Sequence, residues 1–258
     1  MKKSYQRSGN ERGFTMVEML IAIFIGMIVI ALVVTAYWSQ TRTSRNQQMT
    51  VEMQQNIRAG MFFLQRDIVM AGFSDNPSNP SGGTITSATA TSVTFNFADP
   101  ICVEDNIDNN GDGDIDEPFE KDGVDNNGDG DIDEMNELET IQFSLSGNQL
   151  LRDLIEDATN NIRQSETIAT DIEELEFFYT LDDGTTGTGI ASQGQRDRIS
   201  KIGISILART ESDVMGFTDR QVYRPLSFAS TGVEWGPYND HIRRELVTTT
   251  VLCRNMVR

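Results

Sequence analysis

Residues 13–38 read GFTMVEMLIAIFIGMIVIALVVTAYW, and the rest of the chain is organised around this stretch. From Met19 to Tyr37 it contains no charged residue. At about 1.5 Å per residue, a helix of this length spans about 30 Å, which is the thickness of the hydrocarbon core of a bilayer. The stretch is therefore predicted to form a helix that lies in a membrane.

The residues before this helix carry a strong excess of positive charge. Lys2, Lys3, Arg7 and Arg12 precede it, against the single acid Glu11. Basic residues are retained on the cytoplasmic side of a membrane helix. The sequence therefore predicts a cytoplasmic N-terminus and an exported C-terminal part.

Glu18 is an acid just inside the apolar segment, where a carboxylate is costly and is by default a functional candidate. A secretory signal would have a shorter apolar run and a cleavage site of small residues. Here the run ends in residues 35–38, TAYW, with no such site. A simple membrane anchor fits the length and stays an alternative.

The residues from Gly13 to Glu18, GFTMVE, resemble the cleavage and methylation signature of type IV prepilins. The resemblance implies that a prepilin peptidase cuts after Gly13, that Phe14 is then methylated, and that the helix remains in the product. It also implies that Glu18 neutralises the terminal amine of a neighbouring subunit in a filament core, since a buried charge left alone is penalised. A carboxylate that only reaches the headgroups is the alternative.

The helix is predicted to continue beyond the apolar segment and to cover residues 14–71, with about 14–38 in the membrane or filament core. Its second half has apolar residues at spacings of 4, 4, 3 and 4, which is one helix face. These residues are Met53, Ile57, Met61, Leu64 and Ile68. Gly72 is placed to end the helix.

Residues 72–258 are predicted to form a β-rich globular domain. Alternating apolar residues at 93–97 and 141–145 predict strands, and further strands are predicted at 174–181, 198–209 and 241–254. One long helix followed by strands is an α+β arrangement with an antiparallel sheet. Five segments in order also resemble PilW-type minor pilins, which implies the type IV pilin-like fold. They are residues 48–73, 150–152, 174–179, 202–209 and 243–255.

The net charge of −18 is concentrated in one acidic insert. Residues 99–139 hold 17 of the 39 acids and one base, a local net charge of −16, so the rest of the chain is near −2. The insert contains a tandem repeat, because residues 104–120 and 121–137 are identical at twelve of seventeen positions. Basic patches interleaved with aromatics are missing, so nucleic acid is not an expected partner.

Each repeat resembles an EF-hand-like or thrombospondin-type calcium loop, in which alternating oxygen side chains surround one cation. The candidate ligands are Asp108, Asn110, Asp112, Asp114 and Asp116 in the first repeat, and Asp125, Asn127, Asp129, Asp131 and Asp133 in the second. The twelfth loop position lacks the expected Glu, since Phe119 and Asn136 stand there. Two calcium ions are predicted rather than magnesium or zinc. A disordered acidic loop is the alternative.

Two cysteines, Cys102 and Cys253, lie in the part predicted to be exported, where disulfides persist. They either pair or remain two free thiols. His241 is the single histidine and is predicted to be a surface residue in a strand. The sequence has no nucleophile elbow and no phosphate-binding glycine loop, so no enzyme activity is expected.

Together these features predict a minor pilin of a type IV pilus that primes or caps assembly and serves adhesion or twitching motility. Its expected partners are other major and minor pilins and prepilin peptidase. The expected location is the bacterial inner membrane, with one membrane pass and a periplasmic domain, and then the pilus surface. Two alternatives stay open: a pseudopilin of a type II secretion system, and an anchored calcium-dependent adhesin that does not polymerise.

Overall fold

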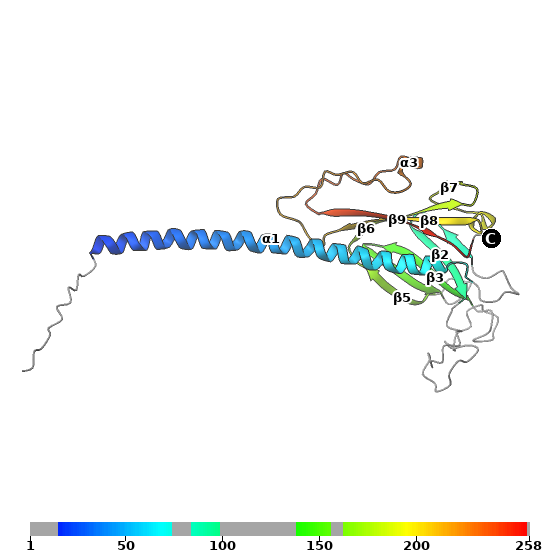
Figure 1. The fold of residues 1–258 in the computed structure, drawn as a ribbon, viewed down its shortest axis with the longest axis horizontal. Helices are drawn as coiled ribbons and strands as arrows, with labels where there is room; N and C mark the ends of the chain where they lie inside the picture. The colour runs from blue at the N-terminus through cyan, green and yellow to red at the C-terminus, as the bar shows by residue number, and fades with distance from the viewer. Residues whose placement is uncertain (1–14, 74–83, 99–137, 156–161, 257–258) are drawn as a thin grey trace, which may run out of the picture. The chain divides into compact units, whose positions relative to one another are not determined.

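The structure is a computed structural model that describes residues 15–73, 84–98, 138–155 and 162–256. The chain divides into two compact units, residues 1–48 and residues 49–258. The helix α1, Met16–Met70, contributes its first part to the first unit and its second part to the second. All strands belong to the second unit (Figure 1).

The strands of the second unit form two antiparallel sheets, which confirms the predicted α+β class with a long N-terminal helix. The five-stranded sheet has the order β1 (Ile85–Ala88), β2 (Ser92–Ala98), β3 (Leu138–Ser146), β4 (Gln149–Ile155) and β5 (Ile162–Ala169). The four-stranded sheet has the order β7 (Thr186–Gly187), β6 (Ile172–Leu181), β8 (Ile199–Arg209) and β9 (Arg244–Leu252). Two single-turn helices are α2 (Gln193–Arg196) and α3 (Phe228–Thr231).

Two details of the strands differ from the sequence-based expectation. Strand β5 was not predicted, because its first six residues are exposed and show no apolar alternation. Strand β9 begins at Arg244, so the expectation that His241 lies in a strand was wrong. Before β9 the chain bonds to the preceding connection instead, where the Val214 N–H donates to the His241 carbonyl at 2.8 Å.

The acidic insert is attached at the ends of two neighbouring strands. Ala98 and Leu138 are the last pair of the β2–β3 ladder, so residues 99–137 leave and re-enter the fold at one place. The repeats themselves lie outside the described residues. A long connection between paired strands is tolerated because the entropy of closing a loop rises slowly with its length.

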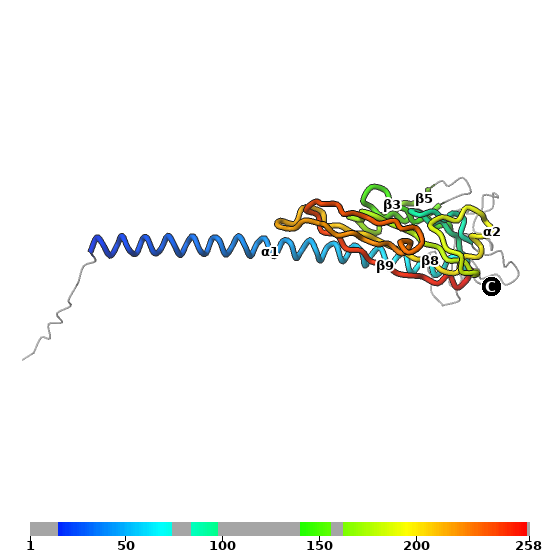
Figure 2. The backbone as a smooth tube through the Cα atoms, turned by 90° about the horizontal axis from the view of Figure 1, so that it is seen from above, coloured from blue at the N-terminus to red at the C-terminus, as the bar shows by residue number. Residues whose placement is uncertain are grey.

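The second half of α1 runs alongside the strands of the second unit (Figure 2). Buried side chains of this half of the helix and of both sheets form the core. The helix contributes the periodic apolar face that the sequence predicted, each member at most 7% exposed: Met53, Ile57, Met61, Leu64 and Ile68. The sheets contribute fully buried side chains such as Phe95, Phe143 and Phe177. Burial of each large side chain stabilises the fold by about 1.5–3 kcal/mol.

Gly60 is a point of close contact between α1 and both sheets. A Cβ atom added there would lie 3.0 Å from Leu150 Cδ2 and 3.3 Å from Ala169 Cβ. Ile206 Cδ1, from the other sheet, would lie at 3.9 Å. The absence of a side chain at Gly60 thus lets one helical turn contact both sheets.

We predict that Gly60→Val lowers the free energy of unfolding by about 1–3 kcal/mol, because the added carbons overpack this contact. Chemical denaturation of the full chain in detergent measures the change. Gln55→Val is the matched control, since it places the same side chain at an exposed position of α1 and should change stability little. An equal effect of both variants would show that helix propensity, not packing, sets the outcome.

Candidate assembly site

The start of α1 is closed by a reciprocal contact between Thr15 and Glu18. The Thr15 N–H donates to Glu18 Oε2 at 2.8 Å, and the Thr15 hydroxyl donates to the same oxygen at 2.9 Å. In return the Glu18 N–H donates to Thr15 Oγ1 at 3.3 Å. This arrangement is a capping box, which satisfies backbone donors that a helix start leaves unpaired. Glu18 therefore holds the first helical turn in the isolated chain.

The part of α1 in the first unit presents apolar side chains that no part of the described chain covers. The large apolar residues from Met16 to Trp38 are each 46–82% exposed. By length and composition, this helix is apolar enough to cross a membrane. A helix that is apolar on all sides is stable only against lipid or other apolar helices.

Several of the predicted site residues fall outside the described part of the chain. These are the processing residues Gly13 and Phe14, all ten candidate calcium ligands of the two repeats, and Cys102. Among the described residues, no three His, Cys, Asp or Glu side chains are grouped so that they could hold a metal ion. The calcium loops and the pairing of Cys102 with Cys253 therefore stay predictions.

The remaining candidate for reactive chemistry, Cys253, is fully buried just after β9. Burial raises the pKa of its thiol to about 12. At neutral pH almost none of this thiol is ionised, and only the thiolate is a good nucleophile. His241 is exposed, and its Nδ1 lies 2.6 Å from the Phe217 carbonyl, a contact that places the proton on that nitrogen.

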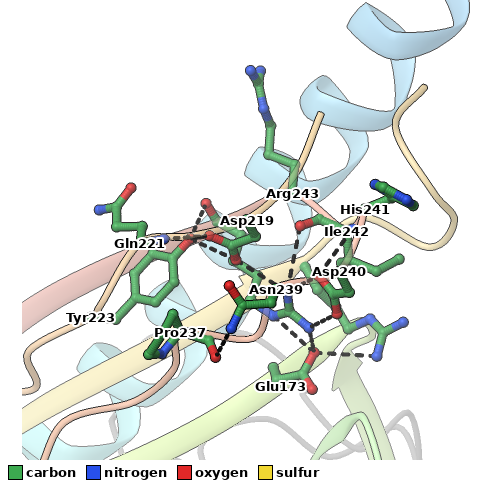
Figure 3. Close-up of polar contacts among 12 residues, drawn as sticks. Glu173, Asp219, Gln221, Tyr223, Pro237, Asn239, Asp240, His241, Ile242 and Arg243 are labelled. Carbon is green, nitrogen blue, oxygen red and sulfur yellow. Dashed lines mark hydrogen bonds and ion pairs between the residues drawn. The ribbon is translucent and has the colours of Figure 1, made fainter. Parts of the chain in front are cut away.

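A buried arginine cluster, which the sequence did not reveal, lies at the start of β9 (Figure 3). The Arg244 side chain is 2% exposed and donates to three carboxylates from two segments of the chain. Nη1 lies 3.1 Å from Asp219 Oδ2 and 2.7 Å from Asp240 Oδ1, and Nη2 lies 3.2 Å from Glu173 Oε2. Asp219 and Asp240 belong to the connection between β8 and β9, and Glu173 belongs to β6.

Two tyrosines complete this cluster. The Tyr223 hydroxyl donates to the Asp219 carboxylate at 3.1 Å, and the Arg244 guanidinium lies 3.8 Å from the centre of the Tyr238 ring. Burial raises the pKa of Tyr238 to about 12. The cluster therefore fastens the connection 210–243 to the beginning of β9. Its members are up to 71 residues apart, so no local spacing in the sequence could have indicated it.

Comparison with known proteins places these features in a class. Residues 8–34 match the prokaryotic N-terminal methylation motif. The chain is 39% identical to the pilin-like protein PilA3 of Thermus thermophilus over 62 residues, which are 24% of this chain. This match spans 27% of the length of that relative.

The fold resembles that of the type IV-like pilin TTHA1219 from Thermus thermophilus, with a TM-score of 0.51 at 13% sequence identity. The likeness covers 80% of this chain and 98% of that chain. At this identity it shows the fold alone. The chain thus has a type IV pilin-like fold and carries the N-terminal methylation motif, as the sequence predicted.

We predict that Arg244→Met lowers the free energy of unfolding by about 3–5 kcal/mol, because three carboxylates lose their shared buried cation. Denaturant titration of the full chain in detergent measures this loss. Arg243→Met is the control, since Arg243 is exposed and lies outside the cluster. A loss below 1 kcal/mol for Arg244→Met would mean that the cluster does not fasten the connection.

The same cluster predicts a pH dependence of stability. Hydrogen bonds from Arg244 hold the pKa of the Asp240 carboxyl below its usual range. A carboxyl with a lowered folded-state pKa contributes stability above its unfolded pKa, and this contribution is lost as the pH falls through the folded value. We expect thermal stability to fall more steeply below about pH 4 in the wild type than in Asp240→Asn, which a series of melts measures.

Proposed function

We propose that this protein is a minor pilin of a type IV pilus system, cut after Gly13 by a prepilin peptidase and methylated on Phe14. The observation that supports this most directly is that the methylation motif of residues 8–34 runs into a helix whose apolar side chains are not covered by the described part of the chain. Cleavage on the cytoplasmic side keeps this helix in the product. Such a helix is an anchor in the inner membrane first and a packing surface for other pilins afterwards.

The geometry at the start of α1 suggests how Glu18 serves assembly. Both bonds from Thr15 end on Oε2, and among the described contacts none ends on Oε1. Oε1 is therefore open to a further donor while Oε2 keeps the capping box. The new amine on Phe14 of a neighbouring pilin is a donor of the right charge, and a charged pair in an apolar surrounding is costly to break.

This role places the globular domain in the periplasm before assembly and on the pilus afterwards. A low-abundance subunit of this kind primes or caps the filament together with major and minor pilins. Adhesion and twitching motility are the processes that such a pilus serves.

We further propose that the repeats bind two calcium ions. Each offers five alternating Asp and Asn side chains within nine residues, a donor set of hard oxygens that suits calcium. Without the metal the crowded carboxylates repel one another. The insert would therefore become stiff in the millimolar calcium of an extracellular medium, where a surface loop makes its contacts.

We predict that Glu18→Gln abolishes incorporation into pili while the protein still accumulates in the inner membrane. The amide keeps an acceptor for Thr15 but removes the charge that pairs with a neighbouring amine. Immunoblots of sheared pili and of membranes measure the two pools. Thr15→Val is the matched control, because it removes the side-chain half of the capping box and leaves the charge; it should lower incorporation only modestly.

Equal incorporation of Glu18→Gln and wild type would contradict the assembly role of this carboxylate. Deletion of the gene separates the proposal from its nearest alternative. Loss of piliation or twitching with normal protein secretion is expected for a minor pilin. Loss of secretion with normal pili would instead identify a pseudopilin of a type II secretion system.

We predict that calcium at about 100 times its dissociation constant stabilises the full chain by roughly 2.7 kcal/mol per site coupled to folding. Calorimetry and thermal melts in detergent, with and without millimolar calcium, measure binding and stabilisation. Asp112→Asn with Asp129→Asn is the matched variant, because it removes one charge from each repeat. Absence of binding heat in the wild type would remove the calcium proposal and leave the pilin proposal intact.

A further inference from the structure

The two sheets of the globular unit each end in a strand with a free edge. Strand β5 is the last strand of the five-stranded sheet, and β9 is the last strand of the four-stranded sheet. A free edge presents backbone N–H and C=O groups that pair readily with another extended strand. The direction of each edge strand, and the face of the strand on which α1 lies, determine which extended strand can pair with it.

The pairing of β9 with β8 fixes which of its residues face outward. The Cys253 N–H donates to the Ser200 carbonyl, and the Arg243 carbonyl accepts from Thr210, so the odd-numbered residues face β8. Backbone groups alternate from side to side along a strand. The even-numbered residues therefore point their N–H and C=O groups away from the sheet.

Three of these outward residues, Leu246, Thr248 and Thr250, have no backbone partner on that side among the described contacts. A groove of about 350 Å³ lies between α1 and β9. Residues 246–252 contain no charge and no proline, and their ladder with β8 has no bulge. Between residues 246 and 252, β9 therefore lacks the charge, the proline and the bulge by which natural sheets protect an edge.

The β3–β4 turn fixes the outward residues of β5 in the same way. Ser146 and Gln149 close a two-residue hairpin, so the even-numbered residues of β4 face β5. Glu166, opposite Arg152, therefore bonds to β4, and its neighbours Ser165 and Thr167 point outward. Both of these residues are exposed.

The two edges run in opposite directions along α1. Gln54 contacts Glu245 and Gln65 contacts Thr249, so β9 runs parallel to the helix. Strand β4 also runs parallel to it, because Leu150 lies at Gly60 whereas Arg152 bonds to Asp67, further along α1. Strand β5 is antiparallel to β4 and therefore runs against the helix.

The two edges also match in the face that they present. In β9 the inward-bonding Thr249 places its side chain toward α1, so Thr248 and Thr250 lie on the opposite face. In β5 the inward-bonding Glu166 lies opposite Arg152, which bonds to Asp67 of α1, so Ser165 and Thr167 again lie on the opposite face. In both edge strands, α1 therefore lies on the face opposite to the side chains of the outward Thr and Ser residues.

From this geometry we propose that β9 of one copy pairs antiparallel with β5 of a second copy of this chain whose α1 is parallel to the first. Opposite strand directions give the antiparallel ladder, and the matching faces keep both copies of α1 on one side of the joined sheet. Outward Thr and Ser residues meet across the ladder, a pairing that is favourable in sheets. The charges of β5 meet no like charge between residues 246 and 252.

This contact joins two different surfaces, so it repeats from copy to copy and produces a row or a helix rather than a closed dimer. A β9–β9 contact would instead set the two copies of α1 antiparallel. The parallel arrangement requires that the copies enter one membrane in the same orientation, so the inference rests on the proposed pilin function. A short row of copies would seed the filament that a priming pilin starts.

Cysteine cross-linking of the full chain in cells tests this arrangement. Thr248→Cys is combined with Thr167→Cys, and separately with Ser165→Cys to allow for a shift of register, with Cys102→Ser in every variant. Paired residues in antiparallel strands lie within the distance that a disulfide spans. We expect a ladder of covalent multimers on non-reducing gels from at least one double variant, and monomers from each single variant.

Thr186→Cys with Thr248→Cys is the matched control, because Thr186 is exposed at the other edge of the four-stranded sheet and should give no ladder. Dimers from Thr248→Cys alone would overturn the proposal in favour of a β9–β9 contact. Absence of a ladder from both double variants would overturn it outright. The mass of the chains in the same samples shows whether they have been cleaved after Gly13. Cleaved chains that form no ladder would refute this inference alone. Uncleaved chains would refute the proposed function.

Discussion

The structure depends on where the apolar surface of α1 is buried. In the second unit, one face of the helix lies against two sheets, and Gly60 allows the close contact. From Met16 to Trp38, the helix has large apolar side chains on all sides and the described chain gives them no cover. Removing apolar area from water contributes roughly 25 cal/mol per Å², so this half of the helix requires lipid or other helices.

Burial of apolar side chains does not determine where each strand of the second unit begins. Long-range polar contacts determine this for β9. Arg244 joins carboxylates from β6 and from the connection 210–243, and so sets where β9 begins. Since β8 pairs with one edge of β9 and α1 contacts side chains on one of its faces, the other edge of β9 stays free, and the position of β9 determines which backbone groups lie on it. The same cluster that stabilises the domain therefore also positions the surface that a second copy would use.

The helix and most strands could be predicted from the sequence because their patterns are local. The face from Met53 to Ile68 follows one helical period, and the predicted strand at 198–209, with Ile202, Ile204 and Ile206 at every second position, is β8 in the structure. Strand β5 has no apolar pattern and exists because β4 offers it an edge. The Arg244 cluster depends on residues far apart in the chain, so it follows only from the fold. Of the candidate site, the sequence predicted the Glu18 region, and the structure adds the contacts of Glu18 with Thr15.

The central claim is that the apolar helix is trimmed at its cytoplasmic edge and kept for packing against other pilins. Mass spectrometry of the N-terminal peptide of the protein from native membranes or pili tests this claim most directly. The account predicts a chain that begins at Phe14 and carries one methyl group on its amine. A chain that retains residues 1–13 in functional protein, or one cut on the far side of residue 38, would contradict it.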